Sequence, residues 1–240
     1  RKQHMGISVT GYLSATDEQQ SWLPHLYEDL RHYDEEYSEQ LGSPPCQKLT
    51  TVKPSGTLSS LCNPAMTHGW HPAHFHQGIR RVRFSSSNPL VARCAAHGYP
   101  VEHAQRLDGS TDPSCSIVSF PLEYPAAAKL ARVMTAVQQL EAIRRLQTEY
   151  SDNAVSSTVV FYPKELPAVK EWLKTNFTTC LKTISFLQRG EQDWWPQMPF
   201  QELTRQEFET FKAVVTPLAR TPVQAGTADQ YLQESECEGS

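Results

Sequence analysis

The chain has 240 residues, 39% of them hydrophobic and 20% charged, which is ordinary usage for a globular protein with a packed core. Its formal net charge of −4 argues against a nucleic-acid partner, because nucleic-acid binders usually carry a basic face. No apolar run approaches the roughly 20 residues that cross a bilayer, so we expect no membrane partner either.

In the first part of the chain, the hydrophobic pattern predicts a strand over residues 5–10, a helix over 17–41, an extended segment over 47–53 and the start of a helix within 57–62. The large residues of the first helix recur at helical spacing and are expected to form its buried stripe: Trp22, Leu23, Leu26, Leu30, Tyr33, Tyr37 and Leu41. Residues 63–78 are rich in Pro, His and Gly and predict a long loop, which in a compact domain is usually functional.

In the rest of the chain, the predicted elements are strands over 79–84, 116–120, 155–162 and 183–187 and helices over 88–97, 126–150, 165–175 and 204–215. From Pro217 onward there is little hydrophobic content, so we expect a mobile tail over 217–240. Strands that alternate with helices indicate an α/β fold with a largely parallel sheet. In such folds, ligands bind at the carboxyl ends of the strands.

The segment over residues 48–60 reads as a strand that runs through a Ser-Gly-Thr turn into a helix. The free amides at a helix start favour an anion, and a glycine there lets the backbone approach it closely. The candidate phosphate-binding residues are Ser55, Gly56, Thr57, Leu58 and Ser59. On the pattern alone, simple capping of the helix by a hydroxyl side chain is the commoner interpretation, since this is not a Walker sequence.

Two further polar groups call for weaker interpretations. His68, His71, His74 and His76 lie in the long loop, but no carboxylate or thiolate stands at ligand spacing, so we expect no metal there. Asp152-Asn153 precedes a predicted strand and either forms a turn or cap or faces a ligand.

The cysteines are scattered, without a CxxC pair or zinc-type spacing: Cys46, Cys62, Cys94, Cys115, Cys180 and Cys237. This favours reduced thiols and a cytoplasmic location. Cys237 stands on the acidic tail, where neighbouring acids raise a thiol pKa, and it is either an incidental surface thiol or a redox cysteine that needs a partner.

Several segments are familiar in this order: residues 5–11 (MGISVTG), 48–60 (KLTTVKPSGTLSS), 79–84 (IRRVRF), 97–101 (HGYPV), 151–156 (SDNAVS) and the terminal Cys-Glu-Gly. Together they resemble the monomeric, adenosylcobalamin-dependent ribonucleoside-triphosphate reductases, collinearly along residues 1–240. No single motif is decisive, but the ordered set is specific.

The resemblance implies the C-terminal part of a ten-stranded α/β barrel over residues 1–216 and a truncated redox tail over 217–240. In this family a thiyl radical, generated with adenosylcobalamin, abstracts the ribose 3′-hydrogen, and the triphosphate substrate is reduced to the 2′-deoxyribonucleotide for DNA synthesis. A deoxyribonucleoside-triphosphate effector and a thioredoxin-type reductant are the implied partners. The segment from Ser55 to Ser59 is similar to the loop that binds substrate phosphates, and Cys237 to the first cysteine of the tail pair, whose partner would lie beyond Ser240.

The resemblance also places the radical-bearing cysteine before Arg1, so we expect the chain alone to be inactive. Two alternatives remain open: a ribonucleotide reductase with another radical generator, or a catalytically inert nucleotide-binding module. A cysteine and a glutamate in the upstream finger loop would separate them.

Overall fold

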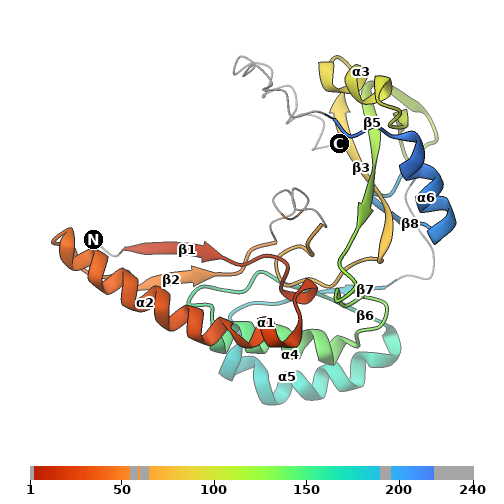
Figure 1. Ribbon diagram of the computed structural model, residues 1–240. Coiled ribbons are helices and arrows are strands. Elements are labelled where there is room, and N and C mark those ends of the chain that lie inside the picture. The colour runs from red at the N-terminus through yellow and green to blue at the C-terminus, as the bar shows by residue number, and fades with distance from the viewer. Residues whose placement is uncertain (1–2, 55–58, 60–64, 190–195, 219–240) are drawn as a thin grey trace. The chain divides into compact units, whose positions relative to one another are not determined.

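The computed structural model describes residues 3–54, 59, 65–189 and 196–218 (Figure 1). The chain divides into two compact units, which are described separately. The first unit comprises residues 1–76 and 124–191, and the second comprises residues 77–123 and 192–240. The described part of the chain contains no helix that is long and apolar enough to span a membrane.

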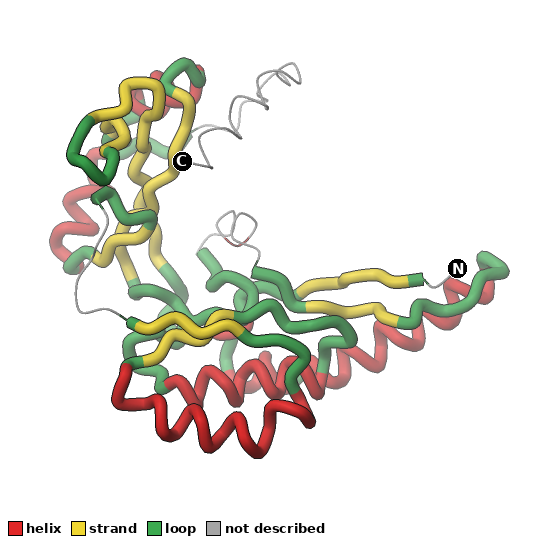
Figure 2. The backbone as a smooth tube through the Cα atoms, turned by 180° about the vertical axis from the view of Figure 1, so that it is seen from behind, coloured by secondary structure: helices red, strands yellow, loops and turns green. Residues whose placement is uncertain are grey.

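The first unit alternates strands and helices. Its elements are β1 (His4–Ser8), α1 (Asp17–Ser21), α2 (Leu23–Gln40), β2 (Lys48–Thr51), α4 (Ala136–Glu149), β6 (Thr158–Phe161), α5 (Leu166–Cys180) and β7 (Ser185–Gln188), with short 3-10 turns at Tyr12–Ser14 and Pro163–Glu165. β1 pairs with β2 and β6 with β7, both in parallel, and a parallel bridge between Val52 and Val155 connects the two pairs. Figure 2 shows both pairs above the helices. The expected α/β fold with parallel strands is confirmed in this unit.

The core of the first unit lies between these strands and α4. It is formed by apolar residues that are 3% exposed or less: Leu13, Val52, Trp70, Ala136, Leu140, Ile143, Leu146, Tyr150, Val155, Val159 and Val169. The helix predicted over 126–150 contributes Leu140, Ile143 and Leu146 to this core, at the helical spacing of three residues.

That helix begins ten residues later than predicted. The structure starts α4 at Ala136, after a capping box formed by Thr135 and Gln138. The preceding backbone groups do not join a helix, because they bond elsewhere. The amide of Lys129 donates to the carbonyl of Leu13, the carbonyl of Lys129 accepts from the amide of Ala73, and the amide of Ala131 donates to the carbonyl of Ala73. The prediction from apolar spacing made the helix too long, because it did not use the capping box at Thr135 and Gln138 that marks the helix start.

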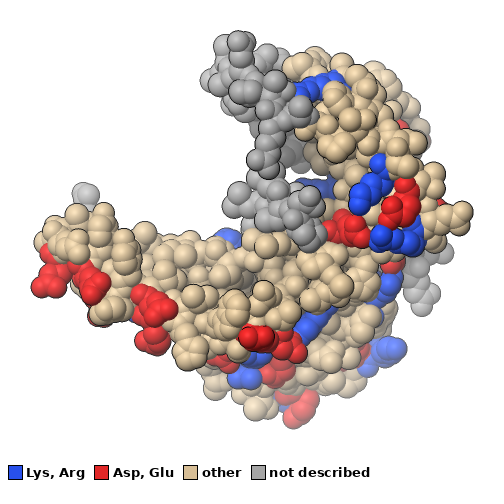
Figure 3. Space-filling model, viewed as in Figure 1, with Lys and Arg blue, Asp and Glu red and all other residues tan. Residues whose placement is uncertain are grey.

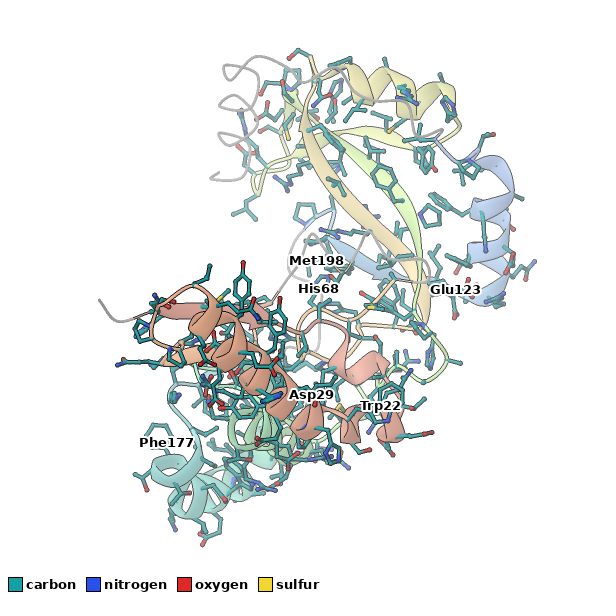
Figure 4. All side chains as sticks on the ribbon, turned by 60° about the vertical axis from the view of Figure 1, so that its left-hand side comes forward. Trp22, Asp29, His68, Glu123, Phe177 and Met198 are labelled. Atoms are coloured by element: carbon teal, nitrogen blue, oxygen red, sulfur yellow. The ribbon has the colours of Figure 1, made fainter. Side chains whose placement is uncertain are left out.

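The helix predicted over 17–41 is also different. It divides at Trp22 into α1 and α2, with Pro24 in the first turn of α2. The expected buried stripe is wrong for most of its members, because Trp22, Leu26, Tyr33, Tyr37 and Leu41 are 45–63% exposed. α2 contacts the core through Leu23 and Leu30, which belong to that stripe, and through Tyr27, which does not. Figure 4 labels Trp22 at the junction of the two helices, and Figure 3 shows acidic side chains gathered along α2.

The second unit is built on an antiparallel sheet with the order β4-β5-β3-β8. Its elements are β3 (Gln77–Ser85), α3 (Pro89–Ala96), β4 (Val101–Gln105), β5 (Thr111–Glu123), β8 (Phe200–Glu202) and α6 (Arg205–Val214). The expectation of a largely parallel sheet is wrong here. β4 and β5 are joined by a tight turn with Gly109 at φ 81°, and a connection this short allows only antiparallel pairing.

A backbone contact fastens α6 to the end of α3. The amide of Thr216 donates to the carbonyl of His97 at 2.8 Å. Gly98 has φ 82°, and a Cβ atom at this position would lie 2.2 Å from the carbonyl oxygen of Val214. The predicted end of the helix over 88–97 at Gly98 is thus confirmed, and the glycine serves the packing of two helices as well as the turn.

Candidate functional site

Ser8 and Lys53, at the carboxyl ends of the paired strands β1 and β2, lie close to Ser156, which follows the bridge residue Val155 and precedes β6. The amide of Lys53 donates to Oγ of Ser8 at 3.1 Å, and the amide of Ser156 donates to the carbonyl of Val52 at 2.9 Å. Nζ of Lys53 donates to Oγ of Ser156 at 3.1 Å. These three residues come from segments that are far apart in the sequence, and they form a polar group beyond the carboxyl ends of β1 and β2, where ligands typically bind in an α/β fold.

The segment around Gly69 supports this edge from the long loop. Gly69 has φ 52°, and a Cβ atom there would lie 2.4 Å from the carbonyl oxygen of Lys53. Trp70 is fully buried, and its Nε1 donates to the carbonyl of Ser156 at 3.1 Å. The amide of Gly69 donates to Oγ1 of Thr10 at 3.0 Å. The backbone that leads into the predicted phosphate loop is therefore held from several sides.

The predicted loop itself lies mostly outside the described residues, since Ser55, Gly56, Thr57 and Leu58 are not among them. Ser59 is described and fully buried, and its carbonyl accepts a hydrogen bond from the amide of Met66 at 3.2 Å. Phosphate binding by this loop stays a prediction. What the structure shows is how the strand before the loop is positioned.

Asp152 is a hub of hydrogen bonds rather than an open ligand group. Its carboxylate accepts from the amide of Leu49 at 2.8 Å, the hydroxyl of Tyr27 at 2.8 Å and the guanidinium of Arg31 at 2.5 Å. Partial burial by itself raises the pKa of Asp152, but these hydrogen bonds outweigh burial and lower it from 3.8 to about 2.

Asn153 completes this connection. Its Nδ2 donates to the carbonyls of Met5 at 3.2 Å and Thr50 at 2.9 Å. The pair therefore joins β1 and β2 to the turn after α4. Of the two interpretations drawn from the sequence, the structure supports the turn.

The histidine cluster does not converge on one point. Nδ1 of His71 lies 3.1 Å from the carbonyl of His68, and the His71 ring packs on Trp70 with centroids 4.6 Å apart. Burial lowers the pKa of His71, so its ring is neutral at pH 7. Within the described ranges, no three His, Cys, Asp or Glu residues are placed to hold a metal ion. Figure 4 labels His68 in this loop.

The described cysteines are free thiols. Cys46, Cys94 and Cys115 are buried, and Cys180 is half-buried. Burial raises the pKa of Cys46 and of Cys94, which makes both poor nucleophiles at neutral pH. Cys62 and the predicted tail cysteine, Cys237, lie outside the described residues.

A separate hollow of about 640 Å³ in the first unit, between the turn at Tyr12 and α4, offers little chemistry. Its lining is mostly apolar, and its charged groups are engaged. Lys129 pairs with Asp17 at 2.8 Å, and Glu141 accepts from Nε1 of Trp172 at 2.5 Å. The strand edge at Lys53 is the better candidate.

Comparisons with known proteins agree with the sequence resemblance. No protein-family model matches the chain. It is 32% identical over 214 residues to an adenosylcobalamin-dependent ribonucleoside-triphosphate reductase of Euglena gracilis, a match that covers 87% of this chain and 28% of the relative. It is 30% identical over 250 residues to a probable enzyme of the same name from Dictyostelium discoideum, covering 99% of this chain and 32% of the relative.

The fold is similar to that of a solved structure, the crystal structure of a B12-dependent (class II) ribonucleotide reductase, with a TM-score of 0.78 and 24% identity. That likeness covers 96% of this chain and 34% of the solved one. The chain thus spans about a third of the length of the relatives it matches. The resemblance is confirmed: over most of its length, this chain is a relative of one portion of the adenosylcobalamin-dependent ribonucleoside-triphosphate reductases.

Proposed function

We propose that the chain is the C-terminal part of an adenosylcobalamin-dependent ribonucleotide reductase that converts ribonucleoside triphosphates to 2′-deoxyribonucleoside triphosphates. Its contribution is the substrate phosphate loop, Ser55 to Ser59. The observation that supports this most directly is the edge at Lys53, where parallel strand ends present the loop from a rigid backbone. The collinear similarity to ribonucleoside-triphosphate reductases supplies the substrate class.

In this proposal the chain's own residues bind and orient the substrate. Backbone amides after Pro54 donate to phosphate oxygens, and Gly56 permits the close approach. Adenosylcobalamin, when bound, supplies the cobalt–carbon bond whose cleavage starts the radical chemistry.

The finer parts of the proposal follow the family. The parallel strands belong to a ten-stranded barrel, residues 1–216 form its C-terminal part, and residues 217–240 form a mobile redox tail. Cys237 on this tail exchanges disulfides with a thioredoxin-type reductant. A deoxyribonucleoside triphosphate is the effector, and the enzyme is cytoplasmic.

The loop assignment is tested by Gly56→Val in the polypeptide of full family length. A valine side chain obstructs the backbone approach, and each lost charge-assisted hydrogen bond is expected to cost roughly 1.5–3 kcal/mol of substrate binding. The measurement is triphosphate affinity by calorimetry, with circular dichroism to confirm folding. Unchanged affinity in a folded variant would show that the loop does not bind the substrate.

The tail assignment is tested by Cys237→Ser in the same polypeptide. A single round of reduction is expected to stay intact, while multiple turnover with a thioredoxin-type reductant collapses and a small dithiol partly restores it. Full steady-state activity with the protein reductant would make Cys237 a bystander.

A further inference from the structure

Lys53 contacts a neutral hydroxyl group, whereas two other basic residues of the first unit are paired with carboxylates. Arg31 is paired with Asp152 at 2.5 Å, and Lys129 is paired with Asp17 at 2.8 Å. Among the described residues Lys53 has no carboxylate partner, and its recorded side-chain contact is the hydroxyl of Ser156. An ammonium group has three donors, so two of them are left for a ligand.

Ser156 is set up to extend this contact. Its Oγ accepts from Nζ of Lys53 at 3.1 Å, and no acceptor for its own hydroxyl hydrogen is found within the described part of the chain. A hydroxyl that accepts from an ammonium group points its hydrogen elsewhere and donates best to an anion. Lys53 and Ser156 together therefore offer several hydrogen-bond donors, and neither side chain carries a negative charge that would repel an anion.

The backbone of both residues is held in place. The amide of Lys53 is bonded to Ser8, and its carbonyl is packed against Gly69. Ser156 is bonded through its amide to Val52 and through its carbonyl to Trp70. The exposed lysine side chain thus starts from a fixed position at the strand ends, two residues before Ser55.

We infer that Lys53 and Ser156 form an anion subsite that binds a phosphate of the ribonucleoside triphosphate. This inference rests on the proposed function and adds Lys53 and Ser156 to the candidate phosphate-binding residues Ser55 to Ser59. Lysine acts there as a point charge, and the hydroxyl of Ser156 fixes the direction of the ammonium group. No carboxylate within the described residues pairs with Lys53 and competes with the phosphate.

The test uses the polypeptide of full family length with Lys53→Gln, Lys53→Arg and Ser156→Ala. A matched control is Lys170→Gln, because Lys170 is an exposed lysine on α5. For each variant, affinity is measured for a ribonucleoside triphosphate, for the corresponding nucleoside and for inorganic tripolyphosphate as a competitor. Circular dichroism and urea unfolding report on the fold.

Lys53→Gln is expected to weaken triphosphate binding about tenfold, which corresponds to about 1.4 kcal/mol. Nucleoside binding should stay unchanged, and the salt dependence of triphosphate binding should become shallower. Lys53→Arg should retain most of the affinity, Ser156→Ala should lose a smaller part, and Lys170→Gln should lose none.

Two results would overturn the inference. One is unchanged triphosphate affinity in a folded Lys53→Gln variant, and the other is an equal loss for triphosphate and nucleoside, which indicates a structural role. If Gly56→Val weakens binding while Lys53→Gln does not, the subsite is wrong and the proposed function stands. If neither substitution changes triphosphate binding, both are wrong.

Discussion

The two units use strands in opposite ways, and the difference shows why the candidate site lies in the first. In the first unit, connections between paired strands pass through helices, so the strands run parallel and their carboxyl ends share one edge. In the second unit, a tight turn at Gly109 joins β4 to β5, so neighbouring strand ends alternate. The parallel pairing places the ends of β1 and β2 side by side, and Ser8, Lys53 and Ser156 are hydrogen-bonded there.

The units also differ in which backbone segment lies against a glycine with positive φ. Gly69 presses against the strand end at Lys53, beside the candidate site, whereas Gly98 presses against the end of α6. Lys53 is held by hydrogen bonds to Ser8 and Ser156, while Val214 is the last residue of α6 and is 63% exposed. The same substitution is therefore expected to have different consequences in the two units.

The largest effect is expected from Gly69→Ala. The substitution adds left-handed backbone strain and a 2.4 Å contact with the carbonyl of Lys53, and we expect a loss of roughly 3 kcal/mol or more in unfolding free energy. Gly42→Ala is the matched control, because Gly42 has φ 62° but nothing within 4 Å of its Cβ position. It should cost only about 1 kcal/mol. Urea unfolding measures both, and equal losses would refute the role of the contact.

A smaller effect is expected from Gly98→Ala in the second unit. Strain at φ 82° and the contact with Val214 should cost roughly 2 kcal/mol, reduced by a shift of the end of α6. Its control is Gly109→Ala, with φ 81° and open space around the Cβ position. Triphosphate affinity should be untouched by Gly98→Ala and reduced by Gly69→Ala. If Gly98→Ala reduced triphosphate affinity and Gly69→Ala did not, the assignment of the site to the first unit would be wrong.

Asp152→Asn is expected to remove a pH-dependent contribution from the first unit. The folded pKa of about 2 lies below the ordinary 3.8, so the carboxylate stabilises the fold above about pH 4, and this contribution is lost as the pH falls toward 2. At pH 7 the amide should lower the unfolding free energy by roughly 1.5–3 kcal/mol. Between pH 4 and 2 the variant should lose less stability than the parent. Parallel pH curves would contradict the assigned pKa.

The smallest effect is expected on the exposed face of α2. Tyr33 is 62% exposed, so Tyr33→Ser should change the unfolding free energy by no more than about 0.5 kcal/mol. Leu23→Ala, on the face that contacts the core, should cost roughly 2–3 kcal/mol because Leu23 is 9% exposed. Thermal unfolding compares the two variants. A large loss of unfolding free energy in Tyr33→Ser would show that the buried stripe predicted from the sequence is correct.

The sequence by itself determined the α/β class, the resemblance to a reductase family and the type and order of most helices and strands. These depend on local periodicity, caps and motif wording, all of which act over a few residues. The end of α3 at Gly98 and the buried stripe of α4 at Leu140, Ile143 and Leu146 are examples. The hairpin that joins β4 to β5 was not predicted, although the Asp108-Gly109 pair is typical of a tight turn.

The tertiary structure alone decided which face of α2 is buried, where α4 begins and which residues meet at the strand ends. Each of these depends on partners far away in the chain. Ala73 takes the backbone hydrogen bonds around Lys129 that a longer helix would need, and Ser156 meets Lys53 across about 100 residues of sequence. Periodicity shows which residues share one face of a helix. Which face is buried depends on the tertiary neighbours that cover the helix, and these are not encoded in the local pattern.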